Sequence, residues 1–239
     1  AVPHSSARRH RQRPAWMLAA LAALGLALLL GFSALGVWQL QRRVWKLDLI
    51  ARVTERIHAT PVAPPAAAQW PELDVASLEY QAVRLQGRWL TQKTVLTQAS
   101  TVLGAGYWVL TPLQQGDGTQ VLVNRGFVPG AQRAQWQAPA PADDAPVTVD
   151  GLLRKSEIGG GFLRSNDSAQ QRWHSRDVGA IAQAQQLERA APYFVDAGIP
   201  ALQAASAAEL PPPDIGPWPR PGLTVVRFSN SHLVYALTW

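Results

Sequence analysis

Apolar and polar positions form two kinds of pattern along the chain. Residues 15–38 contain no charged residue and are dominated by Leu and Ala, whereas later apolar runs are short and alternate with polar residues. An apolar run of this length is enough for a helix to cross the roughly 30 Å hydrocarbon core of a bilayer. Trp16 and Trp38 stand at its two ends, where interfacial aromatic residues belong. The pattern predicts a transmembrane helix over residues 15–38.

A cleaved signal peptide is the second interpretation of this segment, because a basic arm precedes it and small residues occur at Ser33 and Ala34. The apolar run is, however, longer than the roughly 7–15 residues usual for a signal peptide. Amphipathic helical spacing also continues over residues 44–53. We therefore favour an anchor, with a juxtamembrane helix and Pro-rich linker over residues 39–65.

Alternation with a period of two predicts strands in the rest of the chain. Residues 83–89 alternate apolar and polar side chains, and residues 107–111 and 120–124 flank an Asp-Gly turn typical of a hairpin. We also expect a short helix through residues 181–187, capped by Ser175. Further strands are expected at residues 94–97, 147–153, 193–196 and 223–228. The fold class is α+β, with an antiparallel β-rich extramembrane domain and a minor helix over residues 66–228.

The end of the chain begins another apolar helical pattern over residues 229–239. Residues 229–231 offer N-cap side chains, and no charge follows them. About eight residues are too few to cross a bilayer. We expect the start of a second transmembrane helix here, and either the chain is truncated or its end is a short interfacial helix.

Composition and charge change this picture mainly by what they exclude. The 239 residues include 22 Lys and Arg, 16 Asp and Glu, and no Cys. Without Cys, disulfide scaffolds, Cys-ligated zinc, iron–sulfur clusters and thiol catalysis are excluded. Seven basic residues and no acid occur in residues 1–46, and they bracket the apolar run. The remainder is nearly neutral, so we expect contact with membrane lipid and no nucleic acid binding.

Topology follows from the same charges. The arm over residues 1–14 carries four arginines and is predicted to be cytoplasmic by the positive-inside rule. Arg42, Arg43 and Lys46 beyond the helix oppose that orientation.

Chemical motifs are missing: there is no nucleophile elbow or acid–base motif, and His58 and His174 lack metal-ligand spacing. These observations favour a protein that is not an enzyme.

Four segments in a fixed order carry a family resemblance. They are residues 36–42 with Lys46; residues 107–112 with 121–129; Asn166, Asp167, Trp173 and Asp177 leading to residues 192–196; and residues 230–239. Together they cover nearly the whole chain. The sequence resembles the surfeit locus protein 1 family of cytochrome oxidase assembly factors.

The resemblance implies two membrane helices with the domain between them in the periplasm, at the bacterial inner membrane. It implies assembly of haem–copper terminal oxidases (cytochrome c oxidase), with subunit I and other assembly factors as partners. For bacterial members it implies transient binding of haem a and its insertion into subunit I. The alternative hypothesis is a membrane-anchored scaffold for oxidase subunits that binds no cofactor. A membrane-anchored hydrolase or oxidoreductase is a third hypothesis, disfavoured by the missing motifs.

The resemblance assigns the iron ligand of haem a to His232, at the start of the second helix. A helix N-terminus disfavours imidazolium, so a neutral ring that can coordinate iron is favoured there. Arg42 lies one turn after Trp38, and it either pairs with haem propionates or anchors to lipid headgroups. Trp38 and Tyr235 either stack on the porphyrin or form an aromatic belt. Arg125 either belongs to a structural turn over residues 124–126 or contacts the oxidase partner.

Overall fold

The computed structural model describes residues 15–138, 143–159, 165–200 and 217–223. The chain divides into two compact units. One holds Ala1–Ala51 and Arg227–Trp239, and the other holds Arg52–Val226. His232 and Tyr235, together with the predicted strand beyond Leu223 and the second helix, lie outside the described residues.

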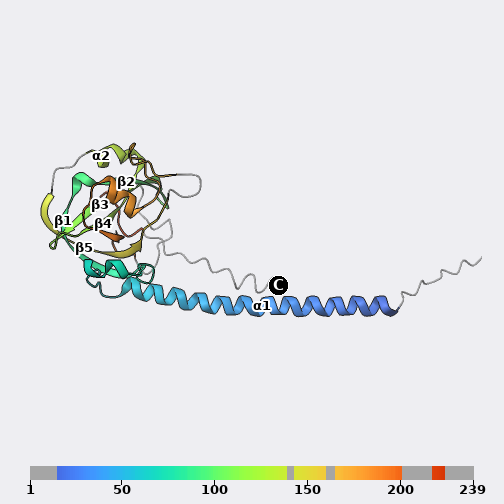
Figure 1. Cartoon of the computed structure of the whole chain (residues 1–239). Helices are drawn as coiled ribbons and strands as arrows, with labels where there is room; N and C mark the ends of the chain where they lie inside the picture. The colour runs from blue at the N-terminus through green and yellow to red at the C-terminus, as the bar shows by residue number, and fades with distance from the viewer. Residues whose placement is uncertain (1–14, 139–142, 160–164, 201–216, 224–239) are drawn as a thin grey trace, which may run out of the picture. The chain divides into compact units, whose positions relative to one another are not determined.

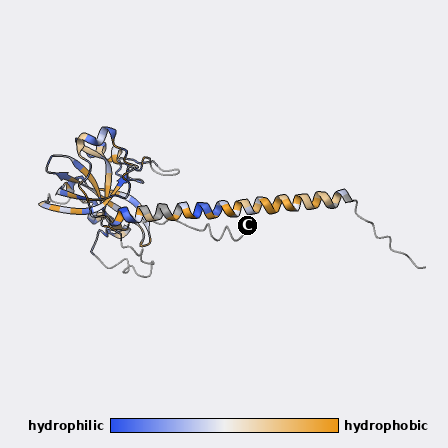
Figure 2. Cartoon of the chain, turned by 90° about the horizontal axis from the view of Figure 1, so that it is seen from below, coloured by the Kyte–Doolittle hydropathy of each residue, from blue (hydrophilic) through white to orange (hydrophobic). Residues whose placement is uncertain are grey.

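Helix α1 (Ala15–His58) is continuous, so the predicted anchor and juxtamembrane helix form one element (Figure 1). Its segment Ala19–Trp45 is long and apolar enough to cross a membrane. Figure 2 shows the first half of α1 almost continuously hydrophobic, followed by a hydrophilic stretch. Large side chains such as Leu29 and Leu30 are more than 60% exposed. The helix therefore presents apolar surface that no described part of its own unit covers.

The second unit is built on a six-stranded sheet. Its order is β1-β5-β6-β4-β3-β2, and β1 also pairs with β3, so five strands close into a ring and β2 lies outside it (Figure 1). The strands are β1 (Ala82–Trp89), β2 (Val95–Thr101), β3 (Gly104–Gln115), β4 (Gln120–Pro129), β5 (Asp143–Lys155) and β6 (Ala190–Ala197). The helices are α2 (Arg133–Gln137), α3 (Val178–Ala184), and the 3-10 turns η1 (Ala67–Glu72), η2 (Thr91–Lys93) and η3 (Gly130–Gln132).

The sheet is mixed, whereas we predicted an antiparallel one. Strands β4 and β6 run parallel. They are not consecutive: the chain between them passes through β5 and α3. A crossover of this kind lets two strands run in the same direction. The minor helix is confirmed, but it begins at Val178 and its N-cap is Asp177, whose carboxylate accepts the Ala180 N–H at 3.1 Å. Ser175 bonds the Asn166 amide instead.

Two apolar clusters divide the side chains of β4 and β6 by their alternation. Val121, Val123, Tyr193 and Val195 belong to one cluster, while Leu122 and Phe194 join the other with α3. Both faces of these strands are therefore buried, which explains why they read as nearly continuous apolar runs.

The compact unit also includes the end of α1, which belongs to the predicted juxtamembrane helix. Ile57 is 4% exposed and packs with Ala82 and Leu152. The Arg56 guanidinium donates to the Ser77 carbonyl at 2.8 Å, and Val62 forms a bridge with Val83 on β1. Residues before position 66 are thus part of the folded domain.

Candidate functional site

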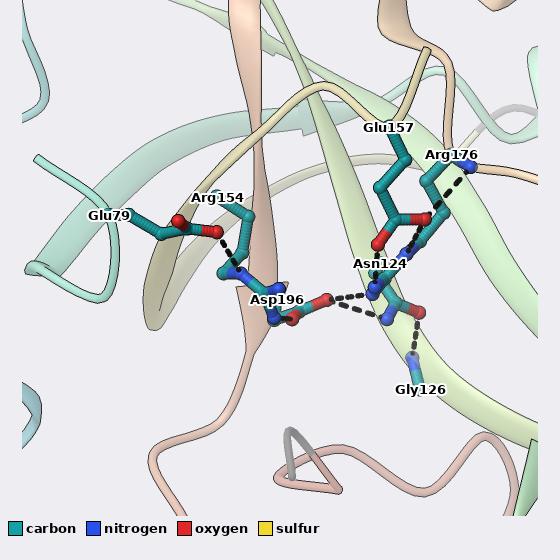
Figure 3. Close-up of polar contacts among 7 residues, drawn as sticks. All are labelled: Glu79, Asn124, Gly126, Arg154, Glu157, Arg176 and Asp196. Carbon is teal, nitrogen blue, oxygen red and sulfur yellow. Dashed lines mark hydrogen bonds and ion pairs between the residues drawn. The ribbon is translucent and has the colours of Figure 1, made fainter. Parts of the chain in front are cut away.

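An alternating series of charges, here called the Asp196 network, joins the loops around β5 and β6 (Figure 3). Asp196 stands at its centre and accepts from Arg154 Nη1 at 2.9 Å and from Arg176 Nη1 at 3.0 Å. Each arginine also has an outer acid: Arg154 pairs with Glu79 at 3.3 Å, and Arg176 pairs with Glu157. Lys155 lies 3.7 Å from Glu79. Three cations thus neutralise three carboxylates.

Burial makes this network costly to disrupt. The Asp196 side chain is 3% exposed, and those of Arg154 and Arg176 are 14% and 13% exposed. The Asn124 amide adds a third donor to Asp196 at 2.7 Å, and its oxygen accepts the Gly126 N–H at 3.1 Å. A buried carboxylate is stable only when paired and hydrogen-bonded in this way.

The ion pair between Glu157 and Arg176 keeps both side chains charged. Burial by itself would raise the pKa of Glu157, but the hydrogen bond and charge of Arg176 outweigh it and the pKa is lowered. Burial would likewise lower the pKa of Arg176, yet Asp196 and Glu157 raise it. The ion pair between Glu157 and Arg176 thus favours the charged form of both groups.

Aromatic rings fix the two arginines further. The Arg176 guanidinium carbon lies 4.7 Å from the Phe194 ring centre and 5.8 Å from that of Trp108. Arg154 lies 4.7 Å from the Tyr80 ring and 6.0 Å from Phe194 on β6. Cations stacked on ring faces in this manner gain further stabilisation.

A short segment over residues 217–223 crosses Gly126, where β4 bulges. Arg220 and Phe127 exchange two backbone hydrogen bonds of 2.9 Å, and Trp218 meets the Phe127 ring edge-on at 6.3 Å. Gly126 has φ +134°, and a Cβ there would overlap the Arg220 carbonyl. The predicted turn over residues 124–126 is therefore wrong: it is a bulge within β4 that only glycine permits. The crossing segment helps to enclose a cavity of about 200 Å³ beside the network.

Arg125 on β4 lies between two tryptophans. Its guanidinium carbon is 4.8 Å from the Trp89 ring centre and 5.5 Å from that of Trp136. Beside them, Arg133 lies 5.1 Å from the Tyr107 ring. We call these five residues the aromatic–arginine patch. All five are half-buried, so ring and guanidinium groups reach the surface of the domain.

The predicted residues of the anchor lie in the other unit. Trp38 is 54% exposed, and Arg42 is exposed with its guanidinium 4.1 Å from the Trp45 ring centre. The structure therefore pairs Arg42 with Trp45, one turn later on α1. Within the described ranges, no group of three or more His, Asp or Glu side chains is placed to hold a metal ion.

A sequence model of the SURF1 family matches residues 26–239. The chain belongs to the SURF1 family. Human Surfeit locus protein 1 is 31% identical over 222 residues, covering 86% of this chain and 68% of the human protein. A SURF1-like protein of Monosiga brevicollis is 32% identical over 217 residues, covering 86% and 76%. A SURF1-like protein of Drosophila melanogaster is 30% identical over 240 residues, covering 92% and 73%.

The SURF1 match takes in α1 from residue 26 onward, the Asp196 network and the aromatic–arginine patch. The predicted resemblance is thus confirmed. Asn124 and Asp196 belong to the segments that carry it, but their contact across 72 residues had no local signal. Sequence reasoning missed Arg154, Arg176 and Glu157, because charged residues scattered through a β domain resemble ordinary surface positions.

Proposed function

We propose that this SURF1-family protein is a membrane-anchored, non-enzymatic assembly factor for haem–copper terminal oxidases. The observation that carries the proposal is the family match over residues 26–239. The structure is compatible with the non-enzymatic part of this proposal, since the buried charges of the Asp196 network are neutralised by one another. Its partners are oxidase subunit I and other oxidase assembly factors.

The proposed location is the bacterial inner membrane, with the β domain in the periplasm. Support comes from the exposed apolar segment Ala19–Trp45 of α1. The arginines of residues 1–14 precede it without an acid, which favours a cytoplasmic arm.

We further propose that the protein binds haem a transiently, with His232 as iron ligand, and assists its insertion into subunit I. Haem a is a flat apolar ring with two carboxylates. Exposed side chains of α1 can contact both the ring and the carboxylates. The Trp38 indole offers a face for the ring, as does Tyr235 by the family resemblance. Arg42 offers a guanidinium for a propionate. Bound to His232, the haem would supply the iron centre that subunit I requires.

Of the two described histidines, His58 is a poor alternative as a ligand. His58 has Nδ1 2.8 Å from the Thr54 carbonyl and Nε2 3.2 Å from the Pro200 carbonyl, so both ring nitrogens are engaged. His174 has Nδ1 3.0 Å from the Gln98 side-chain oxygen. His232 is the ligand to test, because the family resemblance assigns that role to it.

The experiment is purification of the full chain from cells that make haem a, followed by a pyridine-haemochrome spectrum. We expect haem a with the wild type, its loss in His232→Ala, and its retention in the matched control His174→Ala. If wild type and His232→Ala carry equal haem, His232 is not the ligand. If every form is colourless, the carrier proposal fails.

The assembly role has a separate readout. Deleting the gene should lower the haem a absorbance of membranes, and the wild-type chain should restore it. A scaffold that binds oxidase subunits without cofactor is the second candidate, favoured by the aromatic–arginine patch. It requires subunit I to co-purify in mild detergent with a colourless chain. Unchanged oxidase content after deletion would overturn both candidates.

A further inference from the structure

The aromatic–arginine patch contains hydrogen-bond donors without acceptors. Arg133 Nε and Trp136 Nε1 are buried, and neither atom has a hydrogen-bond partner in the described part of the chain. Buried N–H groups are nearly always paired. The two residues are three apart on α2, so both donors lie on one face of that helix. Among the described residues, a hydrogen-bond acceptor is therefore lacking beside Arg133 Nε and Trp136 Nε1.

Charge points to the same place. Among the side chains that the structure describes, no carboxylate lies at ion-pair distance from Arg133, whose guanidinium rests on the Tyr107 ring. Arg154 and Arg176, in contrast, each contact two carboxylates. A carboxylate can take Nε and an Nη group of one guanidinium together. Arg133 thus combines a buried Nε that has no described acceptor with a guanidinium that no described carboxylate contacts, so its fork can take an incoming acid.

The shape of the surface beside the patch indicates which kind of molecule carries the acid. Tyr107 also lines a groove of about 530 Å³, with Gly130 and residues 98–100 of β2. Strand β2 is the last strand of the sheet. Trp173 already pairs with its outer edge at Thr97 and Gln98, so an extended chain would add to the edge beyond Gln98 through its backbone. Trp, Tyr and Arg are the residues that most often carry binding energy in protein interfaces.

We propose that the aromatic–arginine patch and the adjoining β2 groove bind an extended acidic segment of a partner protein, with an Asp or Glu carboxylate on Arg133. The inference deepens the proposed function, since the partner is taken to be one of the proteins of oxidase assembly. Trp89 and Trp136 hold Arg125 between them and form the rigid surround of the site. Binding requires the Arg133 side chain to rotate so that the buried Nε meets the carboxylate, and rotamer changes of this kind are common on binding.

The test uses the full chain in detergent and a short fluorescein-labelled peptide in which Glu alternates with Val. We expect this peptide to bind, and a matched Gln–Val peptide to bind at least about tenfold more weakly, because the charge-assisted hydrogen bonds are lost. Arg133→Glu should abolish binding and Arg133→Lys should weaken it. Trp136→Phe, which removes the N–H and leaves a smaller aromatic ring, should weaken it less. Arg189→Glu, an exposed site beside the turn of the β3–β4 hairpin, is the matched control and should bind normally.

Several outcomes overturn the proposal. They are equal binding by wild type and Arg133→Glu, an equal loss in Arg189→Glu, no binding of the Glu peptide, and binding of phosphatidylglycerol vesicles through Arg133 in place of the peptide. Thermal midpoints of the variants show that each is folded. If gene deletion lowers membrane haem a while Arg133→Glu restores it fully and no peptide binds, this inference fails and the proposed function stands.

Discussion

Two groups of arginines in the β domain differ in what surrounds them. In the Asp196 network, Arg154 and Arg176 each contact two carboxylates and lie over aromatic rings. In the aromatic–arginine patch, Arg133 rests on Tyr107 alone, and its Nε has no acceptor in the described part of the chain. Arginines that are fully paired within the fold stabilise it. An arginine with rings but no carboxylate is prepared for a carboxylate from elsewhere.

The largest effect expected is that of Asp196→Ala, which leaves Arg154 and Arg176 buried and facing one another. Removing one partner of a buried ion pair costs about 3–5 kcal/mol. The midpoint of thermal unfolding, followed by circular dichroism of the full chain in detergent, should fall accordingly. Asp167→Ala removes an exposed ion pair with Arg172 and is the control. Equal losses in both variants would show that the burial of the network is unimportant.

Gly126→Ala should come next, at about 1–3 kcal/mol, because alanine must adopt φ +134° and its Cβ meets the Arg220 carbonyl. The segment over residues 217–223 should separate from β4 and become sensitive to limited proteolysis. Gly116→Ala is the matched control, since nothing lies within 4 Å of a Cβ there. An intact segment in Gly126→Ala would contradict the role given to the bulge.

Acid should weaken the network through Glu157. Its folded-state pKa lies below the ordinary value of 4.5. A carboxylate with a lowered pKa contributes stability above that ordinary value, and the contribution is lost as pH falls through the folded-state pKa. Unfolding midpoints measured from pH 6 down to pH 3 should therefore fall less steeply for Glu157→Gln than for the wild type. Parallel curves would remove Glu157 from the acid response.

Arg133→Gln should have the smallest effect on stability, within about 0.5 kcal/mol, because the described residues offer it no carboxylate to leave unpaired. Arg176→Gln should cost far more, since it strands Asp196 and Glu157. Thermal midpoints of the two variants, measured side by side, give the sharpest version of the comparison. A large loss in Arg133→Gln would mean that the patch is structural.

Local patterns predicted much of the fold. The strands over residues 83–89 and 120–124 and the Asp-Gly hairpin are confirmed, because period-two alternation and turn residues act over a few positions. The parallel pairing of β4 with β6 was missed, since nothing near either strand encodes the crossover. The predicted turn over residues 124–126 was wrong for a related reason: Gly126 packs against the backbone of Arg220, 94 residues later in the sequence.

The sequence by itself determined the apolar helix, the class of the domain and the family, because composition, periodicity and motif order are properties of neighbouring positions. Only the tertiary structure decided which arginines are neutralised. Arg133 and Arg176 are each one basic letter in a nearly neutral domain. Whether a carboxylate lies within hydrogen-bond distance depends on how β5, β6 and the loops between them close the ring. That closure pairs Arg176 with Asp196 and leaves Arg133 at the surface beside Tyr107.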